Sequence, residues 1–344
     1  MKVLFAIQGT GNGHLSRARD VIPALLKHNI SLDILVSGIQ ADIKLPYPVR
    51  YQLKGLSFIF GKKGGVDVWK TYYRANSLRL QKEIKSIPVE DYDLIINDFE
   101  PVTAWACKLK NKPCYSFSHQ AAVLSNLAPK PKKKDRMGKW ILNNYAPTSQ
   151  QFGLHFKSYE SNIYTPIIRN DVRSAIVSNG EHYTVYLPSY SDEKLLRFLS
   201  KMKNIKWEAF SKHNNYEYFS NNIHIKPITN EAFVKSMASS KGVLCGAGFE
   251  TPAESLFMQK KLLVIPMKGQ YEQQCNAAAL AEMGVPVIKS LKKKHLDKVK
   301  HWLDTDIVIP VDYPDNTDKI VSKLLEESLI INQAASPIGI ELKT

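Results

Sequence analysis

The sequence predicts a two-domain α/β fold with a parallel sheet in each domain, and three observations support this prediction. An apolar strand pattern at 2–7 runs into a Gly-rich loop and then a helical pattern at 15–28. A second alternation of strands and helices begins near residue 182. The chain has 344 residues, which is longer than most domains with a single hydrophobic core. The expected parts are an N-terminal domain at 1–165, a C-terminal domain at 166–328 connected to it through 162–169, and a tail at 329–344.

Short apolar runs and turn residues place the individual elements. The N-terminal half has expected strands at 2–7, 31–36, 49–53, 58–60, 93–98, 113–117 and 152–159, with helices at 15–28, 67–85 and 101–110. The C-terminal half has expected strands at 182–187, 205–210, 223–226, 242–245, 262–265 and 307–310, with helices at 250–258 and around 322–327.

The first Gly-rich loop, residues 8–14, follows the first strand. Its glycines Gly9, Gly11 and Gly13 do not give the G-x-G-x-x-G pattern of dinucleotide-binding proteins, because His14 occupies the last position. The second strand also lacks a convincing acidic residue at its end. Nicotinamide binding is therefore only weakly indicated.

Polar residues follow the carboxyl ends of neighbouring strands in the N-terminal half. The carboxyl end of one strand presents Asp98 and Glu100, and His119 and Gln120 follow the next strand. In doubly wound sheets ligands bind in the crevice beyond these strand ends, so we expect these side chains and His14 to share one wall.

A second Gly-rich loop follows the strand at 242–245. Gly246 and Gly248 allow a close approach to the backbone, and a helix that starts near Phe249 directs its unpaired N–H groups to the same place. This combination predicts an anion site, most naturally for a diphosphate. Glu254 lies one turn after Glu250, where a carboxylate could accept bonds from ribose hydroxyls. The alternative is a helix start with ordinary capping.

Amide side chains crowd the next loop and helix start, which suits a hydroxyl-covered sugar. These polar residues are Gln270, Glu272, Gln273, Gln274 and Asn276. The alternative for each of them alone is an ordinary polar surface.

The second motif resembles the donor-binding half of GT-B glycosyltransferases, especially the peptidoglycan N-acetylglucosaminyltransferase and the UDP-glycosyltransferases. Gly11-Asn12-Gly13-His14 similarly resembles the GxGH segment near the N-terminus of these families. The resemblance implies two Rossmann-like domains that face a central cleft, with acceptor bound by the N-terminal domain and donor by the C-terminal domain. Asn276 follows Gln274 after one residue, where some relatives have two. The donor-binding positions that the resemblance implies are Gly11, Gly13, Gly246, Gly248, Phe249, Thr251, Glu254, Gln273, Gln274 and Asn276.

Glycosyl transfer needs a base that removes a proton from the acceptor hydroxyl. The resemblance to inverting transferases favours His14 or Asp98, and the sequence leaves the choice open. His14 could instead hold its loop through a backbone bond, and Asp98 could orient a histidine or cap the helix near residue 101. Acceptor-facing candidates are Glu100, His119 and Gln120, although His119 could simply close a turn.

The expected donor is a UDP-sugar, by resemblance alone, and no cofactor or metal is expected to be required. Two Asp-x-Asp patterns, at 91–93 and 304–306, both precede apolar strands and are too short to indicate a metal site. Enzymes of the GT-B family usually neutralise the leaving group with helix dipoles. Cys107, Cys114, Cys245 and Cys275 show no metal-ligand spacing, so free thiols are expected.

The net charge of +15 is concentrated in the N-terminal half. Residues 1–165 hold 24 Lys and Arg against 12 Asp and Glu, and the remainder holds 23 against 20. The segment 130–139 precedes Trp140, a combination that suits an anionic membrane surface, although a solvated charge run or an anionic polymer acceptor would explain it too. The residues expected to meet the membrane are Lys130, Lys132, Lys133, Lys134, Arg136, Lys139 and Trp140.

These observations predict an inverting glycosyltransferase that moves a sugar from a nucleotide diphosphate donor to a hydroxyl acceptor, with lipid-linked and cell-envelope glycans among the candidates. The alternatives are a GT-B nucleotide-sugar epimerase and, with less support, a non-enzymatic polyanion-binding protein. Nucleic acid is not an expected partner, because no recognisable binding motif is present. The sequence shows no signal peptide and no membrane-spanning run. The expected location is the cytoplasm, with peripheral contact at the inner face of the membrane.

Overall fold

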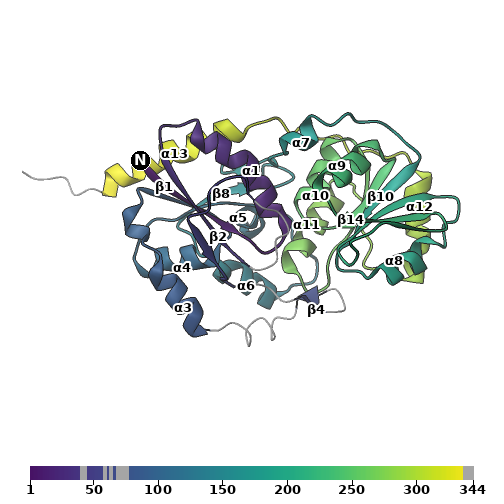
Figure 1. Cartoon of the computed structure of the whole chain (residues 1–344), viewed down its shortest axis with the longest axis horizontal. Coiled ribbons are helices and arrows are strands. Elements are labelled where there is room, and N and C mark those ends of the chain that lie inside the picture. The colour runs from purple at the N-terminus through teal and green to yellow at the C-terminus, as the bar shows by residue number, and fades with distance from the viewer. Residues whose placement is uncertain (39–44, 57–59, 62–64, 67–76, 336–344) are drawn as a thin grey trace, which may run out of the picture.

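The computed structural model has two α/β lobes side by side (Figure 1). It describes residues 1–38, 45–56, 60–61, 65–66 and 77–335. Most of the strand predicted at 58–60, the first part of the helix predicted at 67–85, and 336–344 of the predicted tail lie outside the described residues.

The N-terminal lobe is built on a seven-stranded parallel sheet in the order β3-β2-β1-β6-β7-β8-β9. Its central strand β1 is apolar on both faces, and Val3 to Ile7 are at most 1% exposed, as expected for a parallel strand covered on both sides. The strands are β1 (Lys2–Gln8), β2 (Ser31–Ser37), β3 (Tyr51–Leu53), β6 (Leu94–Asp98), β7 (Tyr115–Ser118), β8 (Gln150–Leu154) and β9 (Ile163–Tyr164), and a separate hairpin pairs β4 (Phe60–Gly61) with β5 (Gly65–Val66).

Helices connect these strands, and their starts follow the local sequence. Helix α1 begins directly after Gly11, whose φ of 89° is a left-handed conformation that favours glycine. Helix α4 has Pro101 in its first turn and is capped by Glu100. The helices of this lobe are α1 (Asn12–Leu26), α3 (Ser77–Ser86), α4 (Pro101–Leu109), α5 (His119–Leu124) and α6 (Arg136–Tyr145), with the short helix η1 at Val89–Asp91.

The C-terminal lobe repeats this architecture in a six-stranded sheet of order β12-β13-β11-β10-β14-β15. Only β12 pairs in the antiparallel sense, at one edge. The parallel strands follow the doubly wound order, which places the carboxyl ends of β10 and β14 at the switch point where ligands bind. The strands are β10 (His182–Tyr186), β11 (Lys206–Ser211), β12 (Tyr218–Ser220), β13 (Ile223–Pro227), β14 (Gly242–Gly246) and β15 (Lys261–Ile265).

The helices of the C-terminal half include one that returns to the first lobe. Helix α13 lies against α1 (Figure 1), where Lys27 of the first lobe pairs with Asp318. The helices are α7 (Asn170–Arg173), α8 (Asp192–Leu199), α9 (Asn230–Ser239), α10 (Glu250–Phe257), α11 (Tyr271–Glu282), α12 (Leu296–Asp304) and α13 (Thr317–Ala335), with η2 at Lys293–His295.

Two sequence predictions need correction. The predicted strand at 307–310 is not a strand, because the edge of β15 is already paired with Val287 and the Ile307 side chain is 60% exposed. The predicted boundary at 328 also divides a continuous helix, since α13 runs from 317 to 335 and packs on the N-terminal lobe. The chain therefore crosses between the lobes twice.

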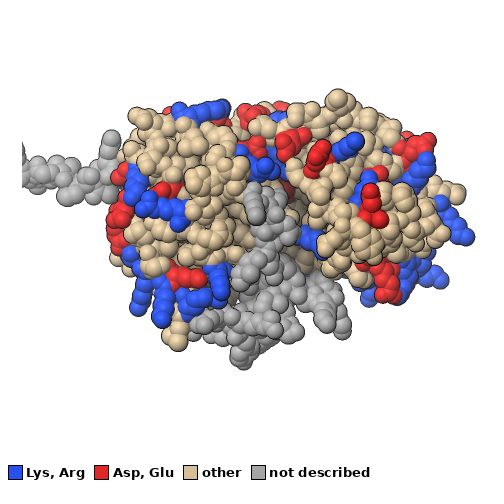
Figure 2. Space-filling view, in the orientation of Figure 1, with Lys and Arg blue, Asp and Glu red and all other residues tan. Residues whose placement is uncertain are grey.

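The four cysteines are free and buried, as expected. Lys and Arg are spread over both lobes on the face seen in Figure 2, with Asp and Glu among them.

Candidate functional site

A cluster of charged side chains lies where β1 runs into α1 and where β6 ends. The Nδ1 atom of His14 lies 2.9 Å from Asp98 Oδ1, and Arg17 Nη2 donates to both oxygens of Asp98, at 2.7 and 2.8 Å. His14 and Arg17 are three residues apart on α1, so they share one helix face. The structure therefore brings together the two predicted catalytic candidates and adds an arginine.

Asp98 is held as a carboxylate in this cluster. It is 1% exposed, and burial alone would raise its pKa, but Arg17 and His14 outweigh burial and lower the pKa below its usual value. An ionised carboxylate can accept a proton from His14 Nδ1, which would leave Nε2 as the ring nitrogen that takes a proton; Arg17 Nη2 also lies 3.2 Å from Nδ1. This is the geometry of a histidine base oriented by a carboxylate.

The Phe99 side chain lies beside the charged cluster. Its φ of 57° is an uncommon left-handed conformation for a residue with a side chain. Its ring stacks on Tyr145 with centroids 4.8 Å apart and lies parallel to the His14 ring at 6.5 Å. The turn after Asp98 thus places an aromatic wall beside His14.

Arg17 also reaches the other lobe. Its Nη1 donates to Glu250, the first residue of α10, while Nη2 holds Asp98. The Cγ of Glu250 lies 3.2 Å from the place that a Cβ on Gly13 would take. The first Gly-rich loop and the start of α10 are therefore in contact across the two lobes.

The second Gly-rich loop has open space beside its glycines. Apart from the adjoining residues of the chain, no described atom lies within 4 Å of a Cβ built on Gly248, and the nearest atom to one on Gly246 is Gln273 Oε1, at 3.9 Å. Gln273 is oriented by the backbone N–H of Met267, which donates to its Oε1 at 2.8 Å. The glycines, the helix start and Gln273 thus occupy one place, as the sequence predicts for a diphosphate and its sugar.

Glu254 is engaged by an arginine in this structure. Its two oxygens accept bonds from Nε and Nη2 of Arg169, and its side chain is 2% exposed. Arg169 lies between the lobes and also donates to Asn230. A ribose bound at Glu254 would have to share the carboxylate with Arg169. The sequence analysis did not identify this arginine.

His119 and Asn276 meet across the lobes. His119 Nε2 lies 2.7 Å from Asn276 Oδ1, its Nδ1 lies 2.7 Å from the Leu154 carbonyl, and its ring stacks on Phe249 at 3.9 Å. Asn276 also donates to the Ala247 carbonyl at 3.2 Å. Both side chains are buried, and burial lowers the pKa of His119. The predicted acceptor-side histidine and sugar-binding asparagine contact each other in this structure.

Two other predicted acceptor residues have protein partners. Gln120 donates to Glu272 at 3.1 Å, another contact between lobes. Glu100 is fully buried and accepts bonds from the N–H groups of Val102 and Thr103 and from the Ser37 hydroxyl. These contacts give Glu100 a capping role in α4, so we do not include it in the site.

The comparisons with known proteins identify the family. A family model described as glycosyl transferase family 1 matches residues 1–305. The chain belongs to this family. Its fold is GT-B, as expected, and it is a glycosyltransferase. No curated protein matches the sequence.

Solved structures of other glycosyltransferases share the fold over nearly the whole chain. Arabidopsis thaliana UGT89C1 complexed with UDP has a TM-score of 0.57 and 13% identity, with 95% of this chain and 94% of that chain covered. Phytolacca americana UGT2 with UDP-2fluoro-glucose and pterostilbene has a TM-score of 0.57 and 14% identity, with 98% and 96% covered. The spinosyn rhamnosyltransferase SpnG with spinosyn aglycone has a TM-score of 0.52 and 11% identity, with 96% of each chain covered.

The remaining predicted donor residues of this glycosyltransferase, Thr251 and Gln274, are half-buried on α10 and α11. Arg17 and Arg169 were missed because their roles depend on partners 81 to 233 residues away in the chain. The spacing of His14 and Arg17 on one helix face is the signal that could have indicated Arg17.

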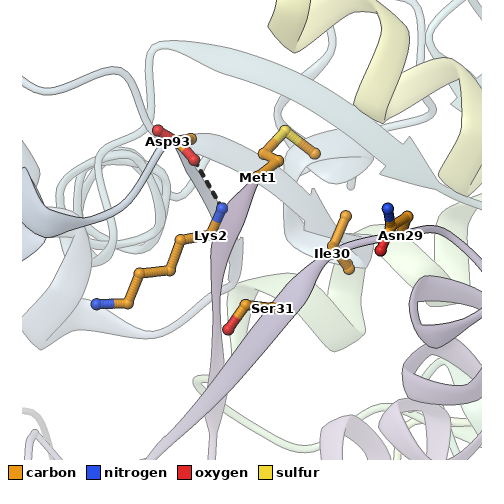
Figure 3. Close-up of a pocket in the computed structure, with 6 residues that line it drawn as sticks. All are labelled: Met1, Lys2, Asn29, Ile30, Ser31 and Asp93. Atoms are coloured by element: carbon orange, nitrogen blue, oxygen red, sulfur yellow. Dashed lines mark hydrogen bonds between the residues drawn. The ribbon is translucent and has the colours of Figure 1, made fainter.

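Figure 3 shows a surface pocket at one end of the N-terminal sheet. The charged cluster of His14, Arg17 and Asp98 follows the other ends of the same strands. The pocket opens at the amino ends of β1 and β2, where the Lys2 N–H donates to Asp93 at 2.7 Å. Because ligands of such sheets bind beyond the carboxyl ends, we do not assign this pocket a role in transfer. Its lining residues are Met1, Lys2, Asn29, Ile30, Ser31 and Asp93.

Proposed function

We propose that this glycosyltransferase is an inverting enzyme in which His14 is the base and Asp98 orients it. The observation that carries the proposal is the pair of His14 Nδ1 and Asp98 Oδ1, 2.9 Å apart. An acceptor hydroxyl at His14 Nε2 would lose its proton as its oxygen attacks the anomeric carbon of the donor. A single displacement of this kind inverts the configuration at that carbon. A correctly placed base contributes roughly 10²–10⁴-fold to the rate.

The donor in this proposal is a UDP-sugar bound at the second Gly-rich loop. The open space at Gly248 and the free N–H groups at the start of α10 suit the diphosphate, and Gln273 and Gln274 would face the sugar. The UDP complexes among the structural neighbours support this nucleotide, whereas SpnG has been solved with thymidine diphosphate, which makes TDP the competing choice. The dipole of α10 would stabilise the leaving diphosphate, so we propose no required metal.

The acceptor is a hydroxyl compound that reaches His14 from the N-terminal lobe. Structural neighbours hold the apolar acceptors pterostilbene and spinosyn aglycone. Here α6 exposes Met137 and Trp140 beside the lysines at 132–134, which favours an acceptor carried at an anionic membrane surface. Across the described ranges, no helix combines the length and apolar character of a membrane span.

The first experiment is calorimetric titration with UDP-glucose, TDP-glucose and GDP-mannose, with and without EDTA. We expect UDP-glucose to bind best and EDTA to change nothing. Gly248→Val should weaken binding at least tenfold, because its side chain fits the empty loop but occupies the space of the diphosphate. The control is Ala281→Val, an exposed change on α11. The proposal fails if no nucleotide sugar binds, or if Gly248→Val binds as well as the control while both variants melt like the wild type.

A further inference from the structure

Glu250 places a carboxylate where the proposed function needs an anion to bind. It is the first residue of α10, so it lies among the N–H groups that would face the diphosphate. Its stem packs on Gly13, and its head is bound to Arg17. A carboxylate and a diphosphate close together repel each other, so both cannot occupy this place as full anions.

The charges around Glu250 come from four segments. Arg17 and His14 face it from α1, Asp98 lies behind Arg17 on β6, Glu254 is one turn further along α10, and Arg169 lies beside Glu254. Burial and Glu254 raise the pKa of Glu250 to about 7, and they outweigh the opposing effect of Arg17 and Arg169. With this pKa, the neutral and the charged forms of Glu250 are close in free energy near neutral pH.

Arg17 is the cation for which the two anions would compete. It is 2% exposed and has a fixed fork, with Nη2 on Asp98 and Nη1 on Glu250. An arriving diphosphate could replace Glu250 on Nη1 while Nη2 keeps Asp98 in place for His14. One guanidinium would then face both the leaving group and the carboxylate that orients the base.

We propose that Glu250 is a proton-linked gate of the donor site: the donor diphosphate displaces the Glu250 carboxylate from Arg17, and Glu250 takes up one proton from solvent as it does so. This inference rests on the proposed donor site and adds the residue that regulates it. Arg17 then acts as a positioning residue that holds Asp98 and becomes available to the diphosphate only when Glu250 is neutral.

The proposal fixes the sign of the pH dependence. Donor binding favours protonated Glu250, so donor affinity is fully present below the pKa of the free enzyme, about 7, and decreases as pH rises above it. One proton taken up corresponds to a change of up to about tenfold in the dissociation constant per pH unit. A sugar-linked diphosphate is a suitable probe because it has no group of its own that titrates between about pH 6 and about pH 8.

The test measures the dissociation constant of the nucleotide sugar that binds best, from the panel above, at about pH 6, 7 and 8. For the wild-type enzyme we expect tight binding at the lowest pH, and a loss of roughly tenfold between the lowest and the highest pH, most of it between the two higher values. Glu250→Gln should bind about tenfold more tightly than wild type at the highest pH, with no dependence on pH. Glu90→Gln, an exposed glutamate that pairs with Lys110, is the matched control and should follow the wild type.

A merely structural Glu250 gives the opposite result. Loss of a structural ion pair would weaken donor binding. The inference is therefore overturned if folded Glu250→Gln binds the donor more weakly than wild type, or if its affinity depends on pH as that of the wild type does. In both cases the proposed donor site stands. If Glu250→Gln does not fold, a wild-type affinity that is flat from about pH 6 to about pH 8 still overturns it, and a decline supports it. Absence of binding by every nucleotide sugar overturns the inference together with the proposed function.

Discussion

Two carboxylates one turn apart on α10 each have an arginine partner from a different segment. Glu250 pairs with Arg17 of α1, and Glu254 pairs with Arg169 between the lobes. Like charges at this spacing repel, and burial increases the repulsion, so each glutamate depends on its cation. These two pairs connect α10 to α1 and to the segment between the lobes.

Asp98→Asn should lower kcat by roughly 10²–10⁴-fold with little change in donor KM, because an amide neither fixes the His14 tautomer nor balances the imidazolium that forms during transfer. Asp91→Asn is the matched control, since Asp91 is exposed near the other end of the strand. Steady-state kinetics with the donor varied check this. A kcat within threefold of the control, in a variant that melts like wild type, would contradict the assignment of Asp98.

Glu254→Gln should lower the free energy of unfolding by about 3–5 kcal/mol, since it removes the carboxylate that forms the ion pair with the buried Arg169 guanidinium. Urea titration measures the loss. The double variant Arg169→Met with Glu254→Leu should recover most of it, because replacing both partners removes the buried charge. If Glu254→Gln is as stable as wild type, the ion pair is dispensable and Glu254 is free for a ribose.

At the scale of elements, the buried parallel strands at the centre of each sheet and the two Gly-rich loops were predictable, because such strands have apolar runs and glycines follow them. The partners of the polar side chains in the site were not predictable. His119 contacts Asn276 and Glu254 contacts Arg169 through tertiary packing that no local pattern encodes. The expectation that His14 and Asp98 share one wall agrees with their contact, because both follow strands that are neighbours in the sheet.

Helix α13 shows the same limit of local patterns. The sequence predicted a helix around 322–327, but its position against α1 depends on tertiary packing: Leu324 is buried in the same hydrophobic core cluster as Ile22 and Leu25 of α1. Residues 317–335 connect the end of the chain to the first lobe, so α13 contributes to the stability of the N-terminal lobe.

Leu324→Ala should therefore destabilise the protein by about 2–5 kcal/mol, because it leaves a cavity at a side chain that is 1% exposed. Leu329→Ala on the same helix is the control, since that side chain is 48% exposed and should cost much less. Thermal and urea unfolding measure both. Equal effects of the two variants would mean that α13 does not pack on α1 in solution.

At the scale of the whole molecule, the lobes meet through polar and aromatic contacts of α1 and α5 with the starts of α10 and α11. Arg17 with Glu250, Gln120 with Glu272, and His119 with Phe249 each join one lobe to the other. This arrangement brings His14 and the second Gly-rich loop together. In the proposed function the acceptor enters beside the N-terminal lobe, where α6 exposes apolar and basic side chains.

Contact of α6 with an anionic membrane can be tested with two matched lysine triplets. Lys132, Lys133 and Lys134 precede α6, and Lys292, Lys293 and Lys294 lie on the other lobe; all six are exposed. Each well-placed lysine contributes roughly 1 kcal/mol at an anionic surface, so changing the first triplet to Ala should weaken vesicle binding by about 100-fold. The second triplet lowers the net charge equally but should have little effect.

Co-sedimentation with phosphatidylserine-containing and neutral vesicles measures this binding. Trp140→Ala should add a further loss on the anionic vesicles, because its side chain is 63% exposed on α6. Equal weakening by the two triplets would show that net charge, and not the α6 surface, drives binding. Tight binding to neutral vesicles, or no binding to either kind, would remove the membrane from the proposed acceptor pathway and favour an acceptor that diffuses to His14 from solution.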